Sequence, residues 1–171
     1  MKIAIIGSGG MGGYHAGALM DAGAEVHIVT TPRHVAAISD RGLIVHTESS
    51  SRTYHPASVT TDGTGVGVCD LVMITVKLTH FEEPLENCQQ MIGPDTLVLT
   101  FQNGVVAPDM VAKRFGAEHV RHLHRCLHRR PGRGPSDRRP TKDAHRQCTN
   151  WLGRNVPDPR RIQGRTACQR R

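Results

Sequence analysis

The sequence opens with Lys2-Ile-Ala-Ile-Ile-Gly7-Ser8-Gly9-Gly10-Met11-Gly12, and this stretch decides the fold. A short apolar run that ends in glycines is typical of a strand buried in a parallel sheet. The apolar spacing from Met11 to Ala22 predicts a helix, and Gly23 is suited to end it. A strand, a G-x-G-x-x-G turn and a helix in this order predict a site for a dinucleotide pyrophosphate.

The glycines of this turn have separate predicted roles. Gly7 permits the tight turn, Gly9 lets the backbone approach a pyrophosphate, and Gly12 allows close packing of the helix on the strand. The helix N-terminus offers free N–H groups and a partial positive charge to the phosphates. The alternative is a tight turn with a structural role alone. Three further residues of the loop are assigned to the predicted cofactor site: Ser8, Gly10 and Met11.

Strands and helices alternate through the rest of the first 120 residues. Strands are expected at 25–30, 69–76 and 95–101, and helices at 32–41, 81–91 and 108–115. Residues 43–59 suggest two short strands, with a hairpin inserted into the wound sheet as one arrangement, and residues 102–104 suggest a tight turn. The pattern predicts an α/β fold with a Rossmann-type, doubly wound, mainly parallel sheet.

The composition changes abruptly near residue 120. Residues 1–120 contain seven Lys and Arg against twelve Asp and Glu, whereas residues 121–171 contain fifteen against three. The second segment has no sustained hydrophobic period, so we expect a dinucleotide-binding domain at 1–120 and a disordered, Arg-rich tail at 121–171. We also expect a truncated sheet, because the core strand expected near His119-Val120 is lost, which would leave an unpaired apolar edge and poor solubility.

The end of the second strand is expected to select the cofactor. NAD-binding proteins usually place Asp or Glu there to hold the ribose 2′-hydroxyl. The sequence Val29-Thr-Thr-Pro-Arg33-His34 has no acid, and Arg33 could pair with a 2′-phosphate with help from the threonine hydroxyls. This favours NADP over NAD; the alternative is that Arg33 is a solvated residue at a helix start.

Three segments together resemble the ketopantoate reductase (2-dehydropantoate 2-reductase) family. They are MKIAIIGSGGMGG at 1–13, DLVMITVK at 70–77 and LTFQNGV at 99–105. The resemblance covers about residues 1–120. It implies a cytoplasmic oxidoreductase that uses NADPH to reduce a small 2-oxo acid, 2-dehydropantoate, to pantoate on the route to pantothenate and coenzyme A.

The resemblance also implies two site residues, and both are assigned to the cofactor site as well as to the substrate site. Lys77 matches the family's lysine at the mouth of the site, where it would attract the substrate carboxylate. Asn103 matches the asparagine near nicotinamide and substrate, where it would donate to a ligand oxygen. Alternatively, Lys77 is an exposed lysine at a strand end and Asn103 is a turn residue before Gly104.

The sequence departs from the family pattern at two places. Thr31 stands where the family often has Arg, and nothing matches the C-terminal helical domain that supplies the family's proton-donating lysine and a substrate-binding glutamate. We therefore assign no catalytic residue. A nucleotide-binding remnant without catalysis is the alternative function, and an Arg-rich polyanion binder is a third.

Several classes of protein are disfavoured by the composition. No apolar run reaches about 18 residues, so we expect no membrane association. The N-terminal stretch has no basic region of normal length and no A-x-A-like site, so we also expect no secretory signal. Five irregularly spaced cysteines suit a reducing cytosol. With Trp151 as its single aromatic residue, the tail is not expected to bind nucleic acid. One alternating set fits no common zinc spacing, so no metal is predicted: His122, His124, Cys126 and His128.

We interpret the tail as family-like sequence read in a shifted frame. A forward shift of one base permits Arg121–Arg130 to encode Val-Ile-Cys-Thr-Val-Ala-Ser-Thr-Val-Ala. This run is β-branched and apolar, as expected of a strand after Val120. We expect the shifted frame of the coding DNA to stay open well beyond residue 171 and to encode a helical domain with a lysine that faces the site. A stop codon within a few codons of residue 121 contradicts the interpretation.

Overall fold

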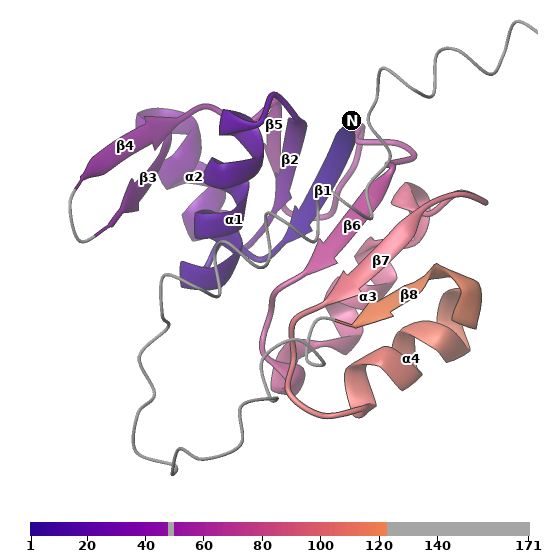
Figure 1. Ribbon diagram of the computed structural model, residues 1–171. Coiled ribbons are helices and arrows are strands. Elements are labelled where there is room, and N and C mark those ends of the chain that lie inside the picture. Colours follow the sequence, from indigo (N-terminus) through magenta and orange to yellow (C-terminus); the bar gives the residue numbers. More distant parts are fainter. Residues whose placement is uncertain (48–49, 123–171) are drawn as a thin grey trace, which may run out of the picture. The chain divides into compact units, whose positions relative to one another are not determined.

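The computed structural model describes residues 1–47 and 50–122, which form a parallel sheet flanked by helices (Figure 1). The sheet has the order β5-β2-β1-β6-β7-β8, and all five pairings between neighbours are parallel. Its strands are β1 Lys2–Ile6, β2 Glu25–Val29, β5 Ser58–Thr60, β6 Leu71–Ile74, β7 Leu97–Thr100 and β8 Val120–His122. This order confirms the predicted Rossmann-type fold. The predicted disordered tail lies outside the described residues, as do the side chains of the alternating histidine and cysteine set.

Helices connect the strands by crossovers, as parallel pairing requires. They are α1 Gly10–Asp21, α2 Pro32–Arg41, α3 Glu82–Asn87 and α4 Val106–Phe115, with 3₁₀ turns at Leu78–His80, Gln89–Met91 and Ala117–His119. The predicted helix at 81–91 is thus divided into α3 and a 3₁₀ turn. None of the described helices has the length and apolar character needed to cross a membrane.

Helices cover both faces of the sheet, so its central strands are apolar throughout. Ala4 and Ile6 of β1 share one core cluster with Phe81, Leu85 and Met91 beside α3, and with Ala107 and Val111 of α4. The intervening residues Ile3 and Ile5 are also fully buried, and they face the other side because side chains alternate along a strand. This double burial explains the continuous apolar run at the start of the sequence.

Residues 43–60 differ from the prediction. β3 Leu43–His46 and β4 Ser51–Tyr54 form an antiparallel hairpin, but it is a separate two-stranded sheet and is not inserted into the wound sheet. The carboxylate of Asp21, at the end of α1, accepts hydrogen bonds from Arg52 (2.7 Å) and from the Tyr54 hydroxyl (2.9 Å). These bonds hold the hairpin against α1, and β5 alone joins the sheet.

The expectation of a lost strand after α4 was wrong. β8 pairs with β7 through Val98 and Val120, Leu99 and Arg121, and Thr100 and His122. The side chain of His119, directly before β8, is buried, and its Nδ1 lies 2.7 Å from the Thr96 carbonyl oxygen. β7 is therefore paired on both sides, and β8 continues two residues past the predicted domain boundary.

The two cysteines in the described part of the chain are free and buried. Burial raises the pKa of Cys69 to about 11 and that of Cys88 to about 12. Both thiols are consequently protonated at neutral pH and behave as small apolar core groups.

The start of α1 rests directly on the end of β1. A Cβ atom added to Gly12 would lie 1.9 Å from the Gly7 carbonyl oxygen and 2.6 Å from Thr75 Oγ1. Gly7 itself has a φ of +102°, and a Cβ there would lie 2.9 Å from Val76 Cγ1. Packing inside the protein is therefore sufficient reason for glycine at positions 7 and 12.

We predict that Gly12→Ala lowers the free energy of unfolding by about 1–3 kcal/mol, because the added methyl group has to displace backbone atoms. The matched control is Gly10→Ala, since an added Cβ there has no heavy atom within 4 Å. Its stability should stay within about 1 kcal/mol of the wild type. Urea denaturation measures both. Equal stabilities for the two variants would contradict this account of the contact.

Candidate functional site

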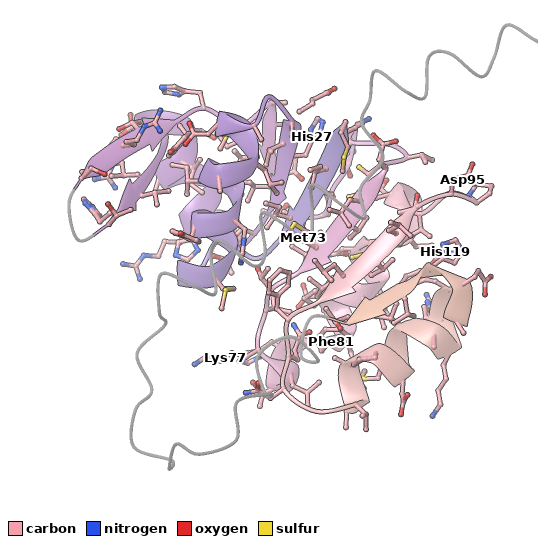
Figure 2. All side chains as sticks on the ribbon, viewed as in Figure 1. His27, Met73, Lys77, Phe81, Asp95 and His119 are labelled. Carbon is pink, nitrogen blue, oxygen red and sulfur yellow. The ribbon has the colours of Figure 1, made fainter. Side chains whose placement is uncertain are left out.

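The predicted site residues lie at one edge of the sheet, the edge formed by the carboxyl ends of the strands. Because all six strands are parallel, the loops that follow β1, β2, β6 and β7 emerge together there. Figure 2 shows Lys77 and Phe81 at this edge, with Asp95 and His119 at the opposite one. Ligands of open α/β sheets bind outside the carboxyl ends of the strands.

Gly9 and Gly10 have open space around them. A Cβ atom on either residue would meet no heavy atom of the described chain within 4 Å, and neither has a positive φ. Gly9 is the N-cap of α1, which has no side-chain cap and no acidic residue in its first turn. The described part of the chain thus gives no packing reason for these two glycines. They leave room and N–H donors for an anionic ligand at the helix N-terminus.

A small polar cluster joins this turn to the end of β2. Ser8 Oγ lies 2.8 Å from Thr30 Oγ1 and 3.0 Å from His34 Nδ1. Thr30 follows β2, and His34 is in the first turn of α2. We did not predict a role for His34 from the sequence. A usable signal was present, because Thr30 and His34 are four residues apart across a helix start.

Arg33 is adjacent to this cluster but takes no part in it. The residue is exposed in the first turn of α2. Its guanidinium has no hydrogen bond or ion pair with any described residue, so its charge is exposed at the start of α2.

Lys77 and Asn103 follow neighbouring strands. Lys77 is exposed and precedes the 3₁₀ turn after β6, and its side chain extends into solvent in Figure 2. Asn103 is exposed within a bend at residues 102–105. Gly104 has a φ of +86°, and α4 begins two residues later at Val106, earlier than the predicted start at residue 108.

Side-chain hydrogen bonds connect the ends of three strands at this edge. The Thr75 hydroxyl, after β6, donates at 2.9 Å to one of the carbonyl oxygens of Ile6 and Gly7. The Gln102 carboxamide, after β7, donates to the carbonyl oxygens of Ile74 (3.0 Å) and Val76 (2.6 Å). The residues that precede Lys77 and Asn103 are therefore directly bonded to each other.

Exposed apolar side chains follow the strands at the same edge of the sheet. Four of the exposed large apolar residues follow β1, β6 and β7: Met11, Leu78, Val105 and Val106. An open pocket between α3 and α4 is lined by residues 78–83, Val106 and Met110. The edge thus combines N–H donors at the start of α1 with exposed apolar side chains, a combination that ligand sites commonly have.

Comparison with known proteins identifies the family. The sequence model of the ketopantoate reductase PanE/ApbA family matches residues 3–124. The chain belongs to this family. The match ends close to the position where the composition changes, so it includes β8 and excludes nearly all of the tail. The resemblance found in the sequence is confirmed.

Individual relatives agree with this assignment. A 2-dehydropantoate 2-reductase of Pyrococcus horikoshii is 30% identical over 105 residues, which are 61% of this chain and 34% of that protein. A PanE/ApbA family ketopantoate reductase structure from Ralstonia eutropha gives a TM-score of 0.63 at 33% identity, over 71% of this chain and 40% of that one. The chain spans about a third of the length of the curated relatives that it matches.

A third relative has a different substrate name. The ternary structure of D-mandelate dehydrogenase with NADH and anilino(oxo)acetate gives a TM-score of 0.67 at 28% identity, over 71% of this chain and 40% of that chain. The solved structures that this chain resembles are therefore oxidoreductases whose names contain different substrates.

Proposed function

We propose that this chain binds NADP(H) across the carboxyl edge of its sheet and forms the cofactor domain of a reductase that acts on a 2-oxo acid. The single observation that carries the proposal is the open space at Gly9 and Gly10 beside an uncapped helix N-terminus. Glycines that the protein's own packing does not need are explained by a ligand that does need the space.

The described residues suit each part of such a cofactor. The first N–H groups of α1 would hold the pyrophosphate, since no acidic side chain in that turn would repel it. Arg33 would pair with a 2′-phosphate, and the hydroxyls of Ser8 and Thr30 lie beside it as further donors. The exposed Met11 would cover one side of the bound dinucleotide.

Lys77 and Asn103 would work at the other half of the ligand. The reduced nicotinamide of NADPH supplies a hydride when the cofactor is bound. Lys77 would contact the nicotinamide half of the cofactor and attract the substrate carboxylate by its charge, and the Asn103 amide would orient a nicotinamide or substrate oxygen. These roles rest on family membership together with the position of both residues after neighbouring strands.

For the substrate we propose 2-dehydropantoate, reduced to pantoate on the route to pantothenate, because several relatives are named 2-dehydropantoate 2-reductase. A reducing, cytoplasmic setting is consistent with the free, buried Cys69 and Cys88. We assign no general acid, so the rival function is nucleotide binding without turnover. NADPH oxidation in the presence of 2-dehydropantoate separates the two functions.

We predict that Gly9→Ala weakens NADPH binding about tenfold or more, since a methyl group enters the space assigned to the pyrophosphate; tenfold corresponds to about 1.4 kcal/mol. Its free energy of unfolding should fall by no more than about 1 kcal/mol, because Gly is preferred to Ala at an N-cap position but no side-chain hydrogen bond is lost. Calorimetric titration and urea denaturation measure the two quantities. Unchanged affinity in a stable Gly9→Ala variant refutes the proposed pyrophosphate site.

We predict that NADPH binds more tightly than NADH and that Arg33→Ala removes most of the difference. A charge-assisted hydrogen bond of this kind contributes about 1.5–3 kcal/mol. The matched control is Arg41→Ala, which removes an exposed arginine from the last turn of the same helix. In Arg41→Ala the ratio of the dissociation constants for NADPH and NADH should stay at the wild-type value. Equal affinities of the wild type for NADPH and NADH would contradict the preference, and the NADH bound to D-mandelate dehydrogenase makes NAD the competing choice.

A further inference from the structure

Gln102 is buried although its neighbours at the edge are exposed. Only 7% of its surface is accessible, whereas the next residue, Asn103, is exposed. The carboxamide nitrogen donates to the carbonyl oxygens of Ile74 and Val76, and its oxygen accepts a hydrogen bond from the Phe101 N–H at 3.1 Å. One side chain therefore makes three hydrogen bonds to backbone groups at the ends of two strands.

These bonds extend the pairing of β6 and β7 beyond the backbone ladder. The Phe101 N–H still reaches the Ile74 carbonyl oxygen, at 3.3 Å, and from there the two backbones separate. The Gln102 side chain bridges the widening gap and reaches Val76 at 2.6 Å, a short distance for a neutral N–H···O bond. Val76 is fixed from the other side as well, because it packs against the Gly7 turn.

We propose that Gln102 is a positioning residue that holds the backbone before Lys77 and the backbone of Asn103 at a fixed separation. It contacts no ligand in this proposal; it acts through Lys77, which directly follows its partner Val76, and through Asn103, which directly follows Gln102 itself. The inference rests on the proposed function, in which these two residues contact the nicotinamide half of NADPH. The pyrophosphate half is held by the α1 turn, which Gln102 does not touch.

Because different residues hold the nicotinamide half and the pyrophosphate half of NADPH, a variant of Gln102 should weaken the contacts of the nicotinamide half alone. Gln102→Met keeps the length and the apolar stem but removes both donors, so the Val76 carbonyl oxygen loses its side-chain partner. The matched control is Gln90→Met, because the Gln90 side chain also donates to a loop carbonyl, that of Asp62 at 2.9 Å. Gln90 precedes Met91, whose carbonyl accepts from Cys69 just before β6, so the control lies at the opposite edge of the sheet.

Two ligands are compared in calorimetric titrations: NADPH and 2′-phospho-ADP-ribose, the same molecule without nicotinamide. In Gln102→Met the ratio of their dissociation constants should shift about tenfold against NADPH, and in Gln90→Met it should not change. A general loss of stability would weaken both ligands together and leave the ratio unchanged. Lys77→Ala and Asn103→Ala should shift the ratio in the same direction, and combining either with Gln102→Met should add less than the separate effects.

Hydrogen–deuterium exchange supplies a readout that needs no ligand. The amides of residues 75–79 and 102–104 should exchange faster in Gln102→Met and at the wild-type rate in Gln90→Met. If Gln102→Met does not fold, Gln102→Leu is used, because its side chain is uncharged and also lacks the donors.

The possible results separate the two proposals. Unchanged exchange, or an unchanged ratio in a protein that still binds NADPH, overturns the positioning role alone. A wild-type chain that binds neither NADPH nor NADH overturns the proposed function and the positioning role with it. Faster local exchange together with the shifted ratio supports both.

Discussion

The contact on which this structure depends is the one between Gly12 at the start of α1 and the carbonyl group of Gly7 at the end of β1. A hydrogen atom fits there and a methyl group does not, since the added carbon would lie 1.9 Å from the carbonyl oxygen. This approach directs the N-terminus of α1 toward the carboxyl edge of the sheet. The Thr75 hydroxyl donates to the backbone at the end of β1, so the contact also connects β1 to β6.

The four glycines of the turn therefore divide into two pairs with different physical causes. Gly7 and Gly12 are required by contacts inside the protein, whereas Gly9 and Gly10 face open space. The motif in the sequence does not distinguish these causes, because every glycine in it has the same letter. Only the three-dimensional structure separates glycines needed for packing from those that leave room for a ligand. The open space at Gly9 and Gly10 therefore supports a ligand site independently of the sequence motif.

Much of the fold could be predicted because its signals are local. Glycine, proline and apolar spacing placed α1 and α2 within about one residue of their observed bounds. The two largest errors concern pairing between distant segments. The hairpin lies against α1, where Asp21 binds Arg52 and Tyr54, and β8 pairs with the edge of β7. The site followed the same rule: the glycines were found, and the spacing of Thr30 and His34 was a usable local signal, but the bonds from His34 to Ser8 and from Gln102 to Val76 join residues 26 apart, which no spacing in the sequence predicts.

These long-range bonds have a common consequence for binding. A dinucleotide that lies across the carboxyl edge would contact loops from several strands, and ordering each loop during binding would lower the affinity. Here the loops are already connected: Ser8 to Thr30 between β1 and β2, Thr75 to Gly7 between β6 and β1, and Gln102 to Val76 between β7 and β6. Because each bond joins neighbouring strands, the separation of the loops follows the spacing of the sheet. The rigidity of the parallel sheet is thereby carried into the loops, where a preformed site needs it.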